Sequence, residues 1–185
     1  ESSNVSQGIA QPDRIAVNGP MAWKNLKQVG QTMTNYIQVE ALRYLYLNDL
    51  SSRTGNTMEL RQTQKNLTFL LLGDIKPDTT HRMLLFVEKV FLLKDKYDIL
   101  IKPHPANTVD LKLYPQLCAK ITTQPLEKLF PKVDLTLASV STSAALDAFC
   151  AGIPTINYLD SYDFNLSPLR DIPEAKFINS EEELI

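Results

Sequence analysis

The chain has little of the residues that mark several specialised protein classes. Its 185 residues contain only two cysteines, six glycines and one tryptophan, which excludes a small disulfide-stapled scaffold and a glycine-rich fibrous protein. Cys118 and Cys150 lie in apolar stretches without the spacing of a metal site. We therefore expect two buried free thiols in a reducing cytoplasm and no bound metal.

Long apolar runs and clusters of one charge are also missing. The longest apolar run, Leu67 to Leu72, is far shorter than the ~18 residues that span a bilayer. A net charge of -2 gives no basic stripe for nucleic acid, and the scattered Lys and Arg residues form no polybasic membrane anchor. We expect no nucleic-acid partner, and membrane contact only through a peripheral patch that the fold assembles.

The chain instead shows strand-like and helix-like segments in alternation. This order predicts an α/β protein with a Rossmann-like parallel sheet flanked by helices in three α/β/α layers. Residues 51–65 are polar and read as a linker or mobile loop. We expect residues 1–50 to form the end of a preceding half and residues 66–185 the main domain. The predicted strands of that domain cover residues 67–72, 99–102, 119–122, 135–138, 155–158 and 176–178, with helices from Thr79 or Thr80, over 126–130 and over 142–151.

The stretch Lys102-Pro103-His104-Pro105 directly follows a short apolar run. Proline continues neither a central strand nor a helix, so the chain must turn here, at the strand's carboxyl end. In open α/β sheets ligands bind at that edge. We therefore expect His104 to donate a hydrogen bond to a phosphate oxygen, best when protonated. A surface histidine in a proline-rich turn is the structural alternative.

A second strand end carries the hydroxyl cluster Ser139-Val140-Ser141-Thr142-Ser143 and then a helical pattern closed by Gly152 and Pro154. Unpartnered amides at a helix start, together with hydroxyl groups, make an anion site. We predict that Ser139, Ser141, Thr142 and Ser143 contact a phosphate. Ordinary helix capping is the alternative, because Ser and Thr are favoured at caps anyway.

Other polar residues have weaker roles in this reading. Gly73, which precedes Asp74 at another strand end, permits close approach of a ligand to the backbone. Lys102 is expected on the other side of its strand, and residues 123–126 could contact a base or ribose. We interpret His81 as solvated and Asp147 as solvated or supporting a cap. No G-x-G-x-x-G fingerprint and no P-loop is present.

The His-Pro stretch and the pattern over residues 126–158 resemble the C-terminal nucleotide-binding half of GT-B glycosyltransferases. The resemblance is to bacterial surface-carbohydrate enzymes with a His-Pro motif and a later Ser/Thr motif, such as sialyl-, polysialyl- and Kdo-transferases and CDP-glycerol glycerophosphotransferases. It implies that His104 and the Ser141–Ser143 hydroxyls hold the phosphate of a nucleotide-activated sugar, with a CMP-linked donor favoured and no further cofactor. His104 would be the catalytic group, stabilising the departing phosphate.

The resemblance also implies a setting for this half. The parent enzyme would build O-antigen, lipopolysaccharide or capsule in the cytoplasm, at the inner face of the plasma membrane. The N-terminal half, which usually supplies the catalytic base, would be this chain's partner, so we expect the fragment to be inactive alone. Polyol-phosphate transfer from CDP-glycerol, a sugar-nucleotide epimerase and a non-catalytic nucleotide-binding scaffold are the alternatives.

Overall fold

The computed structural model describes residues 12–28, 35–47, 66–91 and 97–184. The chain divides into two compact units, Glu1–Leu45 and Tyr46–Ile185, and each is described by itself. The predicted linker over residues 51–65 lies outside the described residues, so its prediction stays open.

The first unit is small. Its strands pair in parallel, with Ile15 opposite Tyr36, and Trp23 stacks on Tyr36 with ring centroids 3.9 Å apart. Its elements are β1 (Ile15–Val17), α1 (Pro20–Gln28), β2 (Tyr36–Gln38) and the 3-10 helix η1 (Leu42–Tyr44).

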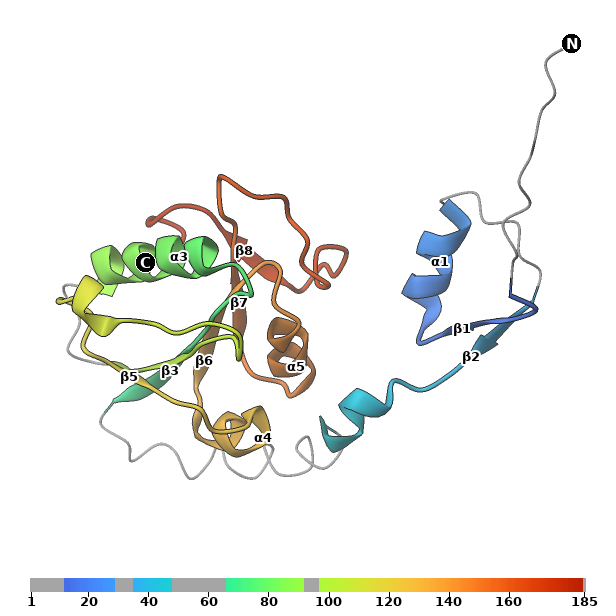
Figure 1. The fold of residues 1–185 in the computed structure, drawn as a ribbon, viewed down its shortest axis with the longest axis horizontal. Coiled ribbons are helices and arrows are strands. Elements are labelled where there is room, and N and C mark those ends of the chain that lie inside the picture. Colours follow the sequence, from blue (N-terminus) through green and yellow to red (C-terminus); the bar gives the residue numbers. More distant parts are fainter. Residues whose placement is uncertain (1–11, 29–34, 48–65, 92–96, 185) are drawn as a thin grey trace, which may run out of the picture. The chain divides into compact units, whose positions relative to one another are not determined.

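The second unit is a six-stranded, fully parallel sheet with flanking helices (Figure 1). The predicted Rossmann-like fold is therefore confirmed. Its strands are β3 (Leu67–Leu72), β4 (Tyr97–Lys102), β5 (Ala119–Ile121), β6 (Leu135–Ser139), β7 (Thr155–Tyr158) and β8 (Lys176–Ile178). Its helices are α3 (Pro77–Phe91), η3 (Leu111–Leu113), α4 (Leu126–Leu129), η4 (Phe130–Lys132) and α5 (Ala144–Cys150).

The strand order is β5-β4-β3-β6-β7-β8. Counted from β3, this is the order 3-2-1-4-5-6 of doubly wound sheets, whose direction of growth reverses between the first and fourth strands. Here that topological switch point lies between β3 and β6, just beyond their carboxyl ends at Leu72 and Ser139.

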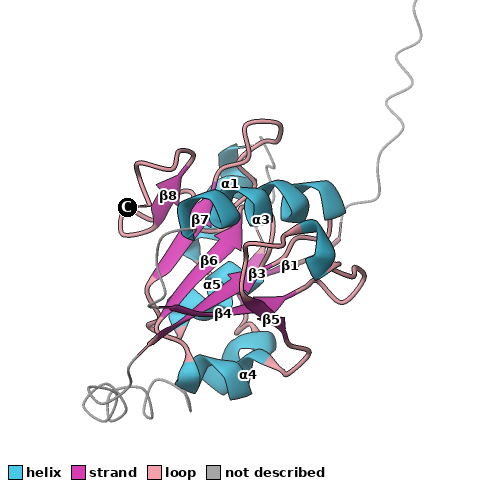
Figure 2. Cartoon of the chain, turned by 90° about the vertical axis from the view of Figure 1, so that its left-hand side faces the viewer, coloured by secondary structure: helices cyan, strands magenta, loops and turns pink. Residues whose placement is uncertain are grey.

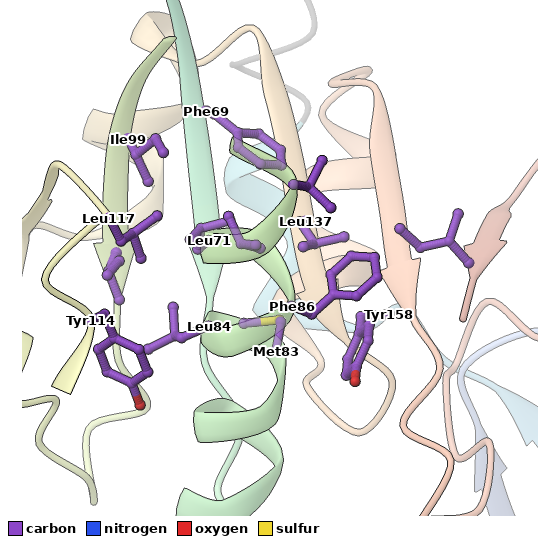
Figure 3. Packing of buried hydrophobic residues seen from close by; sticks show 14 residues of the cluster. Phe69, Leu71, Met83, Leu84, Phe86, Ile99, Tyr114, Leu117, Leu137 and Tyr158 are labelled. Atoms are coloured by element: carbon purple, nitrogen blue, oxygen red, sulfur yellow. The ribbon is translucent and has the colours of Figure 1, made fainter. Parts of the chain in front are cut away.

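Alternation along β3 divides the core between the two faces of the sheet. Phe69 and Leu71 pack against α3 and belong to one buried cluster with Met83, Leu84 and Leu137 (Figure 3). The opposite face carries α4 and α5 (Figure 2). The helical pattern of α3 follows from Pro77 at its first position, where a missing N–H costs nothing, and from apolar residues at a 3.6 period.

The structure tests the predicted helix ends and the predicted burial of the two cysteines. Gly152 has φ +75°, which confirms its predicted left-handed position after α5. The prediction of a cap at Thr79 or Thr80 is wrong, because α3 begins at Pro77 and both threonines lie inside its first turn. Cys118 and Cys150 are free as expected, but both are exposed rather than buried.

Candidate functional site

The predicted site residues lie at one edge of the sheet. Because β3 pairs in parallel with both β4 and β6, the turn carrying His104 and the loop carrying Ser141 leave the sheet at the same edge, on either side of Gly73. Neighbouring strands are ~4.8 Å apart, so β4 and β6 are separated by about 10 Å. A diphosphate-sized ligand could span the strand between them.

Asp74, immediately after β3, fills the centre of this edge. Its side chain is fully buried, and its carboxylate accepts hydrogen bonds from the hydroxyls of Ser139 and Ser141. Each hydroxyl has a single proton, so neither serine can donate to a phosphate while it donates to Asp74. The structure thus gives these two serines a different partner from the predicted one.

Asp74 also joins the two flanking loops through its backbone. Its amide donates to Thr80 Oγ1 at 2.8 Å, and its carbonyl accepts from Asn107 Nδ2 at 2.9 Å. Asn107 belongs to the turn that carries His104: its backbone N–H donates to the His104 carbonyl at 2.9 Å. The sequence pattern predicted Asp74 at a strand end and did not indicate this role; an acidic residue directly after a central strand was the available signal.

His104 is half-buried beside Gly73. Its Nδ1 accepts a hydrogen bond from the backbone N–H of Ala106 at 3.2 Å. An imidazole nitrogen that accepts carries no proton, so the neutral ring has its proton on Nε2. A Cβ on Gly73 would lie 3.3 Å from the His104 backbone nitrogen, so the absence of a side chain there sets how closely the two loops approach.

The hydroxyl loop differs from the predicted anion site. The amide of Thr142 donates to the Ser139 carbonyl at 3.3 Å, and that of Ala145 to the Thr142 carbonyl at 3.3 Å. The Ser141 amide lies 3.5 Å from Ser139 Oγ. The prediction of unpartnered amides is wrong at these positions, because the loop folds back on itself before α5. α5 has only seven residues, and Ser143 makes no side-chain cap bond.

Lys102 connects this edge to the loop after β5. Its Nζ donates to the Gln124 carbonyl at 2.8 Å, and burial lowers the pKa of its ammonium group. The lysine thereby lies against residues 123–126, the stretch expected to contact a base or ribose.

His81 is exposed, in agreement with its interpretation as solvated. Its Nδ1 nevertheless lies 2.6 Å from the hydroxyl of Tyr114, a partner that its sequence position did not indicate. Asp147 is buried at 3% exposure, because α5 turns this residue toward the sheet.

Ion pairs hold the loop after β7 against α3. Arg82 lies 2.6 Å from Asp160, and Lys76 lies 2.5 Å from Asp163. The hydrogen bond from Lys76 lowers the pKa of Asp163. These contacts fix the loop beside the edge where the candidate site lies.

The sheet order and the position of its switch point are those of a Rossmann-like α/β domain. No family model and no curated protein matches the sequence. Among solved structures, the fold is similar to a variant of the wall teichoic acid polymerase TagF soaked with CDPG, with a TM-score of 0.57 and 16% identity over 93% of this chain and 46% of that one. It is also similar to sucrose-phosphate synthase from Thermosynechococcus elongatus, with a TM-score of 0.54 and 13% identity over 94% of this chain and 47% of that one.

The chain therefore spans about half the length of the solved structures it matches. Both neighbours are GT-B glycosyltransferases. The likeness is one of fold, and it agrees with the resemblance to the C-terminal half of such enzymes.

Within the residues that the structure describes, none of the helices is both long and apolar enough to cross a bilayer. The same residues contain no group of three or more His, Cys, Asp or Glu side chains placed to hold a metal ion.

Proposed function

We propose that this chain is the donor-binding half of a glycosyltransferase that builds bacterial surface polysaccharide in the cytoplasm, at the inner face of the plasma membrane. It would bind a nucleotide-activated sugar, CMP-linked in the first instance, without a metal. The observation that carries the proposal is the position of the two motif loops at one sheet edge, on either side of the topological switch point.

In this proposal His104 contacts the phosphate through Nε2. The hydrogen bond from the Ala106 amide to Nδ1 sets the tautomer that presents an N–H at the other nitrogen. As the bond to the sugar breaks, charge grows on the phosphate oxygens, and a preoriented donor stabilises that charge. His104 is the catalytic group in this sense.

Thr142 and Ser143 remain the proposed phosphate contacts from the other loop. Ser139 and Ser141 would act indirectly, because their hydroxyl protons are directed to Asp74. Their role is to hold the loop that positions Thr142. Lys102 and the residues around Gln124 would border the nucleoside.

A CDP-activated polyol phosphate is the second candidate donor. The fold likeness to TagF, studied with CDPG, favours it. Both donors share cytidine and a phosphate, so the same loops would serve either one.

Thermal unfolding of the full chain with CMP, CDP, UDP and GDP tests the proposal. A ligand at a hundredfold excess over its Kd stabilises by about 2.7 kcal/mol, which raises the Tm by about 5–11 °C for a protein of this size. We expect this rise with the cytidine nucleotides, its loss in His104→Ala, and its retention in the neighbouring control Pro105→Ala. The absence of a shift with every nucleotide contradicts donor binding and favours a scaffold without a nucleotide.

A further inference from the structure

A pocket of about 310 Å³ lies away from the proposed donor site. Its volume falls within the ~300–1,000 Å³ of pockets that take small ligands. The lining comes from β3, β4, β5 and η4, on the face of the sheet that α4 covers (Figure 2). Thr68 and Asp98, which line it, are each the second residue of a strand, whereas His104 follows a carboxyl end. The pocket therefore lies toward the amino-terminal end of the sheet.

The strand register places the polar groups of the pocket side by side. Ile99 belongs to the cluster under α3, so the side chains of Asp98 and Leu100 lie on the other face. Thr68 pairs with Asp98, and Leu100 pairs with Lys120. Strand spacing and rise then put the Cα of Asp98 about 8 Å from that of Lys120. A carboxylate and an ammonium group thus border the same stretch of sheet.

Lys132 adds a second ammonium group from above this face. It is the last residue of η4, and the next residue, Val133, is buried. Two hydrogen bonds then fasten the chain to β3. The Thr68 amide donates to the Asp134 carboxylate at 2.8 Å, and the Asp134 amide donates to the Thr68 carbonyl at 2.9 Å. The wall that carries Lys132 is therefore held in place by the protein itself.

The charged side chains of this pocket are available to a ligand. Asp98, Lys120 and Lys132 are exposed. Within the part of the chain that the structure describes, none of these three side chains forms an ion pair or a hydrogen bond. The Thr68 hydroxyl has no hydrogen-bond partner among the same residues, because only its backbone is bonded. Two positive groups, one negative group and one hydroxyl thus face the pocket without a protein partner.

This set of charges selects a ligand class. A simple anion would meet the like charge of Asp98, and a simple cation would meet two ammonium groups, so both are partly repelled. A ligand with two carboxylates and one ammonium group can form a charge-assisted hydrogen bond with every one of these side chains. Two separate carboxylates also suit Lys120 and Lys132, which come from different elements. An acidic α-amino acid has this composition, whereas a phosphate monoester holds its charge in a single group.

We propose that this pocket binds an acidic α-amino acid, with its carboxylates on Lys120 and Lys132 and its ammonium group on Asp98. It is a second ligand site of the chain. Asp98 precedes Lys102, where β4 ends, by four residues, about 13 Å along the strand. The two sites share no residue, so binding in this pocket does not depend on the proposed donor function.

Nuclear magnetic resonance of the full ¹⁵N-labelled chain tests this site. The probes are L-glutamate, L-aspartate, glutarate, phosphoethanolamine and inorganic phosphate at equal ionic strength. We expect glutamate or aspartate to shift the amide signals of residues 98–100, 118–120 and 132–134 in a saturable manner, and to leave those of residues 104–107 unchanged. Glutarate, which lacks the ammonium group, should bind about tenfold more weakly. The proposal is overturned if neither amino acid shifts these signals, or if another probe binds here at least as tightly.

Charge variants at exposed positions test each contact. Lys120→Gln and Lys132→Gln should each raise the Kd about five- to tenfold, both for the amino acid and for glutarate. Asp98→Asn should weaken binding of the amino acid alone, because glutarate has no ammonium group to lose. The matched controls are Glu127→Gln and Lys128→Gln, which change exposed charges of α4 outside the pocket. Equal effects in pocket and control variants would indicate general charge attraction and would overturn the proposed site.

The two exposed thiols of the chain give an independent readout. Both cysteines are exposed, but only Cys118 lines the pocket. A bound amino acid should slow alkylation of Cys118 by the neutral reagent iodoacetamide and leave the rate at Cys150 unchanged, with mass spectrometry following each site. Equal slowing at both thiols, or no slowing at Cys118 when the amide signals are saturated, places the ligand outside this pocket and contradicts the proposal.

Discussion

The carboxylate of Asp74, just after β3, accepts a hydrogen bond from the hydroxyl of Ser139 at the end of β6, and both side chains are fully buried. Ser141 donates to the same oxygen. The contact joins the two strands at the topological switch point, where the loops diverge and backbone pairing ends. Asp74 therefore determines how the candidate site is held together, although it is not itself a proposed ligand contact.

Asp74→Ala should be strongly destabilising. The substitution leaves the buried Ser139 hydroxyl and the Lys76 amide without their acceptor, at a cost of about 3 kcal/mol. The expected fall in Tm is about 6–12 °C for a protein of this length. Asp98→Ala, which removes an exposed carboxylate, is the control and should shift the Tm by much less. Equal Tm values for the two variants would mean that the buried contact contributes nothing.

The Arg82–Asp160 pair should contribute more than an ordinary surface ion pair. The Asp160 side chain is 1% exposed and that of Arg82 is 32% exposed, so Arg82→Met leaves a buried carboxylate without its partner. We expect the free energy of unfolding, measured with a chemical denaturant, to fall by about 2–4 kcal/mol. This is at or somewhat below the cost of breaking a fully buried ion pair. Arg170→Met breaks an exposed pair with Asp171, 46% and 51% exposed, and should cost at most about 1 kcal/mol.

A double-mutant cycle of Arg82→Met with Asp160→Asn isolates this pair. A coupling energy near zero would assign the cost of Arg82→Met to lost packing, including its contact with the Tyr162 ring, rather than to the charge.

Gly73→Ala and Gly152→Ala should differ in their effects. At Gly152 the backbone φ of +75° strains any L-residue with a Cβ, at about 1–2 kcal/mol, and no atom lies within 4 Å of the added carbon. At Gly73 the new Cβ would meet backbone atoms of Pro103 and His104 at 3.3 Å, which displaces the turn at a cost of about 1–3 kcal/mol.

Nucleotide affinity separates these two glycines. Gly73→Ala moves the turn of His104 and should weaken nucleotide binding, whereas Gly152→Ala should change stability alone. Calorimetric titration with CMP measures both. A larger loss of affinity in Gly152→Ala would contradict the positions assigned to these residues.

The strands and the switch point could be predicted because their signals are local. The apolar runs ending at Leu72, Ile101 and Tyr158 have the length of buried strands, and Gly73 or Pro103 follows the first two closely. A parallel sheet then places the carboxyl ends of these strands at one edge, which is why the His104 turn and the hydroxyl loop were predicted to meet there.

The partners of individual side chains could not be predicted in the same way. Whether Ser141 donates to a ligand or to Asp74 depends on a contact between residues 67 positions apart, which no local pattern encodes. Likewise, the contact of His81 with Tyr114 was not predicted, because Tyr114 reaches the histidine from another element. The cysteines were misplaced because an apolar stretch of sequence does not determine which face of an element a single residue occupies.

Cys150 should react more slowly with alkylating agents in the folded protein than in the unfolded chain. Although the residue is exposed overall, partial desolvation of its thiol, and then the nearby Asp147 carboxylate, raise the pKa of that thiol above the ordinary value, because both disfavour the thiolate. The folded state therefore binds this proton more tightly, and the resulting stabilisation is present at low pH and is lost as pH rises through the folded pKa.

Iodoacetamide labelling of a Cys118→Ser variant isolates this thiol, because Cys118 is also exposed. The rate should rise with pH to a midpoint above that of the same protein in urea, where the burial and the carboxylate are removed. Coincident midpoints in the two states would show that the thiol of Cys150 is fully solvated in the folded chain, with no electrostatic influence from α5.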